Sequence, residues 1–186
     1  MTLSALDPRA ALVVVDLQKA VVGLTTAHPT RDVVARSAQL AAAFRRHALP
    51  VVLVNAAGRA PGRTEATLQT RPPSADGAEL VPELDPQPGD IRITKRTWGA
   101  FHGTDLDEQL RRAGVTQVVV TGVATSAGVE STARAAHEHG YHVVLVTDAM
   151  TDMDAGNHTH SVQKIFPRLG ETTTTQELLT ALEARP

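Results

Sequence analysis

The sequence predicts an α/β protein in which a parallel β-sheet lies between two layers of helices. Four valine-rich apolar runs occur along the chain, with helical segments between them. The runs are continuous rather than alternating, which is typical of strands covered on both faces. Strands that alternate with helices indicate right-handed crossovers and a mostly parallel sheet. A length of 186 residues suits a single domain spanning residues 1–186.

The predicted strands are short, and valine is prominent in the strong ones. A weaker run over residues 90–95 lies between the second and the third strong run. The strong runs cover residues 11–17, 50–55, 117–123 and 142–149.

Helix start and stop signals separate these runs. Thr104 is expected to cap a helix with acidic first turns, and Gly140 is expected to end another helix. Thr174 and Glu177 have the spacing of a capping box near the end of the chain. The predicted helices cover residues 30–47, 104–113, 125–139 and 176–184.

The long connection over residues 56–89 interrupts this alternation. It is rich in proline, glycine and polar residues, and it has no sustained hydrophobic period. A connection of this length inside a compact domain is usually a lid or a binding loop. We therefore expect it to help select the substrate.

Composition excludes several classes of function. Eighteen basic against 20 acidic residues give a net charge of −2 without a basic run, so nucleic acid is not an expected partner. The chain has no cysteine, which removes disulfides, thiolate metal sites and cysteine nucleophiles. We see neither a signal peptide nor an apolar run of the roughly 20 residues that a membrane span needs. A soluble, cytoplasmic protein that acts on a small molecule is expected.

Three features are expected to meet at the carboxyl edge of the sheet, where open parallel sheets bind ligands. Asp16 follows the first strand, Lys95 ends the weaker strand, and a turn over residues 122–128 follows the third strong strand. Alone, Asp16 could be a turn cap and Lys95 a solvated charge. Their shared placement favours a functional site.

The turn before the third predicted helix offers backbone N–H groups without intrahelical partners. With the helix dipole, these groups favour a negative charge that develops on a substrate oxygen. Thr125 or Ser126 is expected to cap this helix. Ser126 is not favoured as a nucleophile because no G-x-S-x-G motif surrounds it and no base can be assigned to it.

No metal site and no cofactor are predicted. His137 and His139 are two positions apart on a predicted helix and therefore do not share a face. His158 and His160 would chelate a metal only in an extended segment, and no Asp or Cys partner has clear spacing.

Five stretches in order resemble the isochorismatase-like hydrolases, a superfamily that includes nicotinamidases and N-carbamoylsarcosine amidohydrolases. The resemblance implies a Rossmann-like three-layer sandwich with a six-stranded parallel sheet, a cis peptide at Val123–Ala124, and a homodimer or higher homo-oligomer. The stretches are VVVDLQKA, ITKRTWGAFHGTDLD, VVVTGVATSAGVESTARAA, YHVVLVTDAMTD and KIFPRLGETTTTQELL.

The resemblance also implies roles for individual residues. Asp16 and Lys95 match the Asp and Lys of the amidohydrolase triad, whereas the nucleophilic Cys position falls on Gly128. Gly128 is then expected to supply open space and a backbone donor. Trp98 and Phe101 are expected to form the pocket wall, with ordinary packing or a subunit contact as the alternative. The implied substrate-binding residues are Leu24, Trp98, Phe101, Val123, Ala124, Thr125 and Ala127.

Without a thiol, amide hydrolysis through a thioester is excluded. True isochorismatases also resemble this chain at Gly128; in them a protonated Asp donates to a vinyl ether and water attacks. Asp16 is therefore expected to act as a general acid and base beside Lys95 on a small anionic substrate. No side chain after the second strand matches the isochorismatase Gln, which points to a substrate other than isochorismate. The alternatives are weak water-mediated hydrolysis by a descendant of a cysteine amidohydrolase, and a non-catalytic binding protein.

Overall fold

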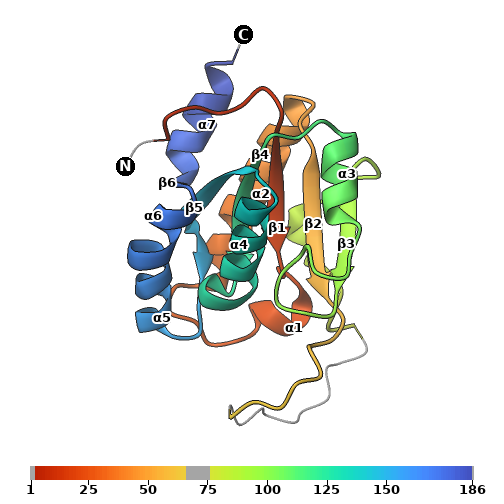
Figure 1. The fold of residues 1–186 in the computed structure, drawn as a ribbon, viewed down its shortest axis with the longest axis vertical. Coiled ribbons are helices and arrows are strands. Elements are labelled where there is room, and N and C mark those ends of the chain that lie inside the picture. Colours follow the sequence, from red (N-terminus) through yellow and green to blue (C-terminus); the bar gives the residue numbers. More distant parts are fainter. Residues whose placement is uncertain (1–2, 66–75, 186) are drawn as a thin grey trace.

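The computed structural model describes residues 3–65 and 76–185 (Figure 1). Within these residues, six parallel strands form one sheet in the order β3-β2-β1-β4-β5-β6. The predicted α/β fold with helices on both faces of a six-stranded parallel sheet is confirmed. The strands are β1 (Ala10–Val15), β2 (Val51–Ala56), β3 (Ile91–Lys95), β4 (Gln117–Val123), β5 (His142–Thr151) and β6 (Glu171–Thr173).

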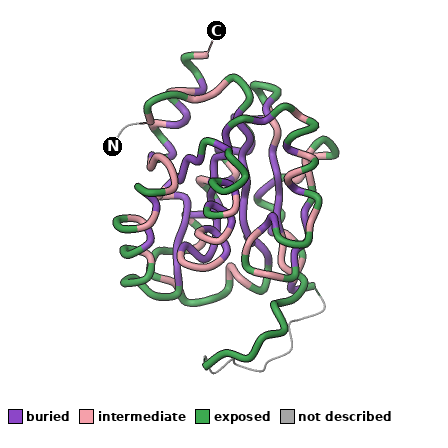
Figure 2. Tube along the Cα trace, viewed as in Figure 1, coloured by how far each residue is buried: buried purple, intermediate pink, exposed green. Residues whose placement is uncertain are grey.

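The two central strands explain the continuous apolar runs in the sequence. Every residue of β1 and β4 is buried, and buried segments fill the middle of the molecule in Figure 2. Along β1, Leu12 and Val14 pack into one core, whereas Val13 and Val15 pack into a second core on the opposite face. Because both faces are covered, no polar residue alternates with the valines.

Helices cover the two faces unequally. The core on one face joins the strands to α2 and α7, and the other core joins them to α3, α4 and α6. Figure 1 shows α3 and α4 in front of the sheet and α2 behind it. The helices are α1 (Lys19–Val22), α2 (Thr30–Arg46), η1 (Pro82–Leu84), α3 (Leu106–Arg112), η2 (Thr125–Val129), α4 (Glu130–Glu138), α5 (Ala155–His160), η3 (Ser161–Ile165), α6 (Phe166–Leu169) and α7 (Thr175–Glu183).

The predicted helices occur with small changes at their ends. The capping box of Thr174 and Glu177 is present at the start of α7. The helix predicted over residues 104–113 begins at Leu106. The Thr104 hydroxyl still accepts a hydrogen bond from the Leu106 N–H, at 3.3 Å. The segment over residues 125–139 is one π-helical turn, η2, that continues into α4. None of the helices described in this structure is long and apolar enough to cross a membrane.

Hydrogen bonds of Gln18, which lies shortly after β1, hold the connection between β2 and β3 at two places. The Gln18 side chain donates to the carbonyls of Ala56 and Gly77 at 3.1 and 3.0 Å, and it accepts from the Ala56 N–H at 2.7 Å. Gln18 also forms an antiparallel bridge with Leu80. Residues 66–75 of this predicted binding loop lie outside the described residues.

Gly122 brings β1 and β4 together at the carboxyl end of the sheet. Its φ of +119° is unfavourable for other residues, and a Cβ atom there would lie 2.0 Å from the Val15 carbonyl oxygen. Only a glycine fits this approach, which places the end of β4 directly beside Asp16.

We expect Gly122→Ala to lower the free energy of unfolding by about 3 kcal/mol or more, because backbone atoms must move apart. Gly114→Ala is the matched control, since φ there is also positive, at +68°, and a Cβ would meet nothing within 4 Å. It should cost only the conformational penalty of about 1–2 kcal/mol. Urea unfolding of both variants measures the difference, and equal losses would contradict the steric argument.

Candidate active site

Asp16 lies directly after β1 in a backbone conformation that few non-glycine residues adopt. Its φ is +54°, in the left-handed region that Asp tolerates better than most residues. Its N–H donates to the Val54 carbonyl at 3.0 Å, and its own carbonyl accepts from Gln18 N–H at 2.9 Å. The backbone on both sides of the carboxyl is therefore fixed by the ends of β1 and β2.

Lys95 ends the edge strand β3, and its side chain reaches across the end of β2 to Asp16. It has the same side-chain orientation along β3 as Ile93, which packs into the core shared with α3 and α4. The ammonium donates to Asp16 Oδ2 at 2.7 Å and to the Thr97 carbonyl at 3.1 Å. Lys95 is 2% exposed and Asp16 is 9% exposed, so water screens this ion pair weakly. The predicted meeting of these two residues is present in the structure.

The two oxygens of the Asp16 carboxyl have different surroundings. Burial raises the pKa of this carboxyl above its ordinary value, while the charge of Lys95 and its hydrogen bond act to lower it. Oδ2 is held by Lys95, whereas Oδ1 is buried without a hydrogen-bond partner among the described residues. A buried unpaired carboxylate oxygen is unfavourable, so Oδ1 is the atom that would carry the proton.

Gly128 packs directly on the Asp16 carboxyl. A Cβ atom at Gly128 would lie 3.1 Å from Asp16 Oδ2, 3.0 Å from Val15 Cγ1 and 3.3 Å from the Val123 carbonyl. The first carbon of any side chain at this position would therefore meet protein atoms closely, and the missing side chain lets the turn approach the carboxyl. The expectation that Gly128 leaves room for a substrate stays a prediction.

The hydroxyls of Thr125 and Ser126 do not cap η2 as expected. The helix begins after Ala124 without a side-chain cap. The Thr125 hydroxyl bonds to His158 Nδ1 at 2.8 Å, and the N–H and hydroxyl of Ser126 donate to Asp152 Oδ2 at 2.7 and 2.8 Å. The Ser126 amide is thus occupied by a carboxylate of the protein itself and is not free for a substrate anion.

His158 and Asp152 are the neighbours of the site that sequence reasoning missed. Asp152 lies just after β5 and is 3% exposed, and His158 is on the short helix α5. The edge of the His28 ring meets the His158 ring, with 4.7 Å between their centroids. The signal in the sequence was limited to VTDAMTD and an isolated His-x-His, neither of which has an informative spacing to Thr125 or Ser126.

Phe101, Trp98 and Leu24, three further predicted pocket residues, differ in how far they are exposed. Phe101 is 7% exposed, and the centroid of its ring lies 5.1 Å from that of His139 and 6.0 Å from that of Tyr141. These contacts favour the alternative that Phe101 has a packing role. Trp98 is 62% exposed and directly follows Thr97, whose carbonyl binds Lys95. Leu24 is 47% exposed in the connection after α1.

The cis peptide bond that the family resemblance implies at the end of β4 is present. The Val123–Ala124 peptide bond is cis, and both residues are buried. Ala127 is partly buried and packs against the core shared with α2 and α7.

The described residues hold no cluster of three or more His, Cys, Asp or Glu side chains that is suited to a metal ion. His137 instead meets the Leu169 carbonyl at 3.0 Å. His139 lies 3.7 Å from Asp107.

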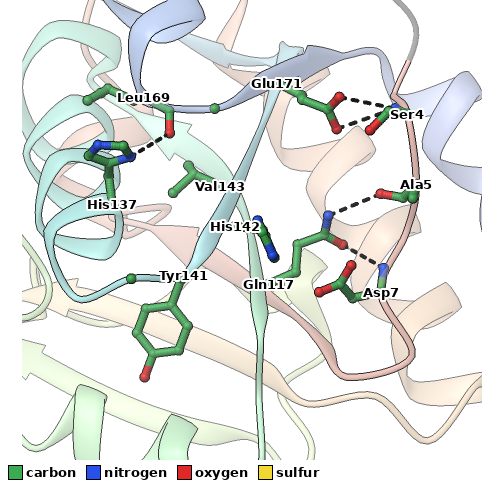
Figure 3. A pocket seen from close by; sticks show the side chains of 12 residues that line it. Ser4, Ala5, Asp7, Gln117, His137, Tyr141, His142, Val143, Leu169 and Glu171 are labelled. Carbon is green, nitrogen blue, oxygen red and sulfur yellow. Dashed lines mark hydrogen bonds between the residues drawn. The ribbon is translucent and has the colours of Figure 1, made fainter.

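A cavity of about 580 Å³ lies at the opposite edge of the sheet from Asp16 and Lys95, where β4 and β5 begin (Figure 3). Its wall includes the N-terminal segment, which Gln117 holds through the Ala5 carbonyl and the Asp7 N–H. Glu171 accepts from the Ser4 N–H at 3.3 Å. None of the predicted site residues lines this cavity.

Comparisons with known proteins agree on one family. A family model, the isochorismatase domain, matches residues 10–177. The chain is 42% identical over 179 residues to the uncharacterized isochorismatase family protein YwoC of Bacillus subtilis, covering 92% of this chain and 93% of the relative. An isochorismatase family protein from Burkholderia thailandensis has a TM-score of 0.92 at 42% identity, over 97% of this chain and 98% of its own. N-carbamoylsarcosine amidase from Thermoplasma acidophilum has a TM-score of 0.76 at 29% identity, over 90% and 96%.

The raised pKa of Asp16 predicts a pH-dependent stability. Protonated Asp16 contributes stability that is complete below the unfolded-state pKa, about 3.9, and is lost as the pH rises through the higher folded-state pKa. The free energy of unfolding, measured relative to Asp16→Asn, should therefore fall as the pH rises over this interval. Urea unfolding from about pH 3 to pH 8 tests this. Lys95→Met should shift this decrease in the free energy of unfolding to higher pH, because the charge that lowers the Asp16 pKa is gone. If the free energy of unfolding relative to Asp16→Asn instead increased with pH, the raised pKa of Asp16 would be contradicted.

Proposed function

Because the chain belongs to the isochorismatase family, we propose that it is a hydrolase in which Asp16 is a general acid and base acting on a small anionic substrate. The observation that carries this proposal is the buried Asp16 carboxyl, in which Oδ2 binds Lys95 and Oδ1 has no hydrogen-bond partner in the described part of the chain. A carboxylic acid that stays protonated closer to neutral pH can donate a proton at that pH.

The reaction that fits these groups is hydrolysis of a vinyl ether or a related bond without a covalent intermediate. Asp16 donates its proton to the substrate carbon, which leaves a carboxylate on the protein and an oxocarbenium ion on the substrate. Water attacks this cation to form a hemiketal, and the proton that water releases returns to Asp16. The hemiketal then collapses: its hydroxyl becomes a carbonyl group, the ether C–O bond breaks, and the hydroxyl proton leaves with the alcohol. The acid is thereby restored after each turnover, and no nucleophilic side chain is needed. The absence of cysteine is consistent with this route.

Lys95 supports an anionic substrate through its charge. While Asp16 is protonated, the Lys95 ammonium has no negative partner in the pair, and it is almost fully buried. A substrate carboxylate nearby would compensate this charge, which is costly to leave alone in a low-dielectric site. Within residues 3–65 and 76–185, two of the three ammonium protons are bonded, to Asp16 and Thr97, which leaves one for a substrate.

We expect Asp16→Asn to reduce turnover by at least about 10²-fold, because the amide is close in shape to the acid and cannot exchange a proton. A panel of enol ethers, each offered as the free carboxylate and as its methyl ester, measures activity and tests the requirement for an anion. Asp148→Asn is the matched control, since Asp148 lies on β5 and bonds to Thr175 rather than to the site. Turnover by Asp16→Asn close to that of the unmodified protein would disprove the role of Asp16.

The same panel separates the alternative functions. Ligands that raise the melting temperature without any turnover would favour a binding protein, and the single tryptophan, Trp98, offers a fluorescence signal beside the site. Amide hydrolysis that appears in Gly128→Cys would favour descent from a cysteine amidohydrolase.

A further inference from the structure

Gly128 lies in the π-helical turn η2. Two side chains that come after β5 in the sequence, Asp152 and His158, form hydrogen bonds to this turn. We infer that Asp152 and His158 are positioning residues of the site: by holding Ser126 and Thr125, they keep Gly128 packed on the Asp16 carboxyl. This inference rests on the proposed role of Asp16 as the acid. It assigns to the β5–α5 connection the control of how far water reaches that acid.

His158 provides the partner for a hydroxyl that is inaccessible to water. Thr125 is fully buried, and its Oγ1 lies 2.8 Å from His158 Nδ1. Burial lowers the pKa of His158, the His28 ring lowers it further, and the Asp152 carboxylate opposes both. A neutral ring with its proton on Nε2 accepts the Thr125 hydroxyl at Nδ1. Without this ring, the buried hydroxyl would have to move to find another partner.

Asp152 replaces the missing local cap of η2. Its Oδ2 accepts both the N–H and the hydroxyl of Ser126, and its Oδ1 accepts the Asp154 N–H at 3.3 Å. A carboxylate at the start of the continuous helix η2–α4 is also favoured by the helix dipole. The bond joins residues 26 positions apart in the sequence, so it fixes the turn against β5.

Gly128 follows two residues after Ser126 in the same π-helical turn. It has no side chain of its own to hold it against Asp16 and Val15, and a Cβ there would already be 3.1 and 3.0 Å from their side chains. The Thr132 hydroxyl donates to the Gly128 carbonyl at 2.6 Å from within the same continuous helix, so the bonds at Thr125 and Ser126 are the ones that hold this turn from outside the helix. A displaced turn would let water reach Asp16 and remove part of the burial that favours its protonated form.

Asp148 lies on β5, four residues before Asp152, and offers a matched control. Its Oδ1 accepts the N–H and the hydroxyl of Thr175 at 2.8 and 3.0 Å, which repeats the bonding pattern of Asp152 with Ser126. Thr175 begins α7, which packs on the opposite face of the sheet from α4. Loss of this carboxylate should therefore weaken a helix start without moving the turn at Gly128.

The test is the titration of Asp16 followed by the ¹³C chemical shift of its carboxyl carbon, with the signal assigned by its loss in Asp16→Asn. We expect Asp152→Ala and Thr125→Val to lower the Asp16 pKa toward the ordinary value of about 3.9. Asp152→Asn separates bonding from charge, because its amide oxygen can still accept the Ser126 N–H. It should retain more of the raised pKa than Asp152→Ala does, and Asp148→Ala should leave the pKa unchanged.

Three outcomes would overturn the inference. The Asp16 pKa could be unchanged in both Asp152→Ala and Thr125→Val; it could fall equally in Asp152→Asn and Asp152→Ala; or it could fall equally in Asp148→Ala. If Asp152→Ala does not fold, Ser126→Ala replaces it and should lower the pKa in the same direction. The titration needs no substrate, so it can fail while Asp16→Asn is still inactive, and it can succeed if Asp16 proves to have no role in turnover.

Discussion

The buried ion pair between Asp16 and Lys95 is the interaction on which the site depends, and the register of the sheet determines it. Val15 pairs with Val54 on β2, and Lys95 pairs with Ala56 two positions further along that strand. A slip of β3 by one residue would turn Lys95 to the other face and leave the Asp16 carboxyl without its partner. The apolar contacts that fix the register are therefore also what places the two charges together.

The second half of the site is a helix start at which Asp152 and His158 already bind the Ser126 N–H and the Ser126 and Thr125 hydroxyls. The π-helical turn η2 contacts a second π-helical turn, η3, whose Ser161 hydroxyl donates at 2.6 Å to Glu130, the first residue of α4. Such turns recur at functional sites because they displace backbone groups from the regular helical pattern. With Asp152 already at Ser126, the charge left to meet a substrate anion is that of Lys95. This concentrates recognition and proton transfer on one pair of side chains.

The sequence predicted the features that depend on hydrophobic patterns along the chain. It did not predict the features that depend on single contacts between residues far apart in the sequence. The four valine-rich runs and the weaker run over residues 90–95 predicted five of the six strands. The rule for the carboxyl ends of parallel strands predicted that Asp16 would meet Lys95. Strand β6 has only three residues and no apolar run, so the family resemblance alone implied a sixth strand. The close packing of Gly128 could not be predicted because it depends on Val15, far away in the sequence. His158 and Asp152 were missed because nothing local links them to the turn.

The position of Lys95 on β3 gives the two halves of the ion pair different local stabilities. Asp16 follows β1, which has a neighbour on each side, whereas β3 pairs with β2 alone among the strands that the structure describes. Edge strands open locally at a lower free energy than central ones, without unfolding of the whole domain. Local opening of β3 would separate the ion pair while β1 and Asp16 stay in place. Amide exchange along β3 would report how often the acid is left without its counter-ion.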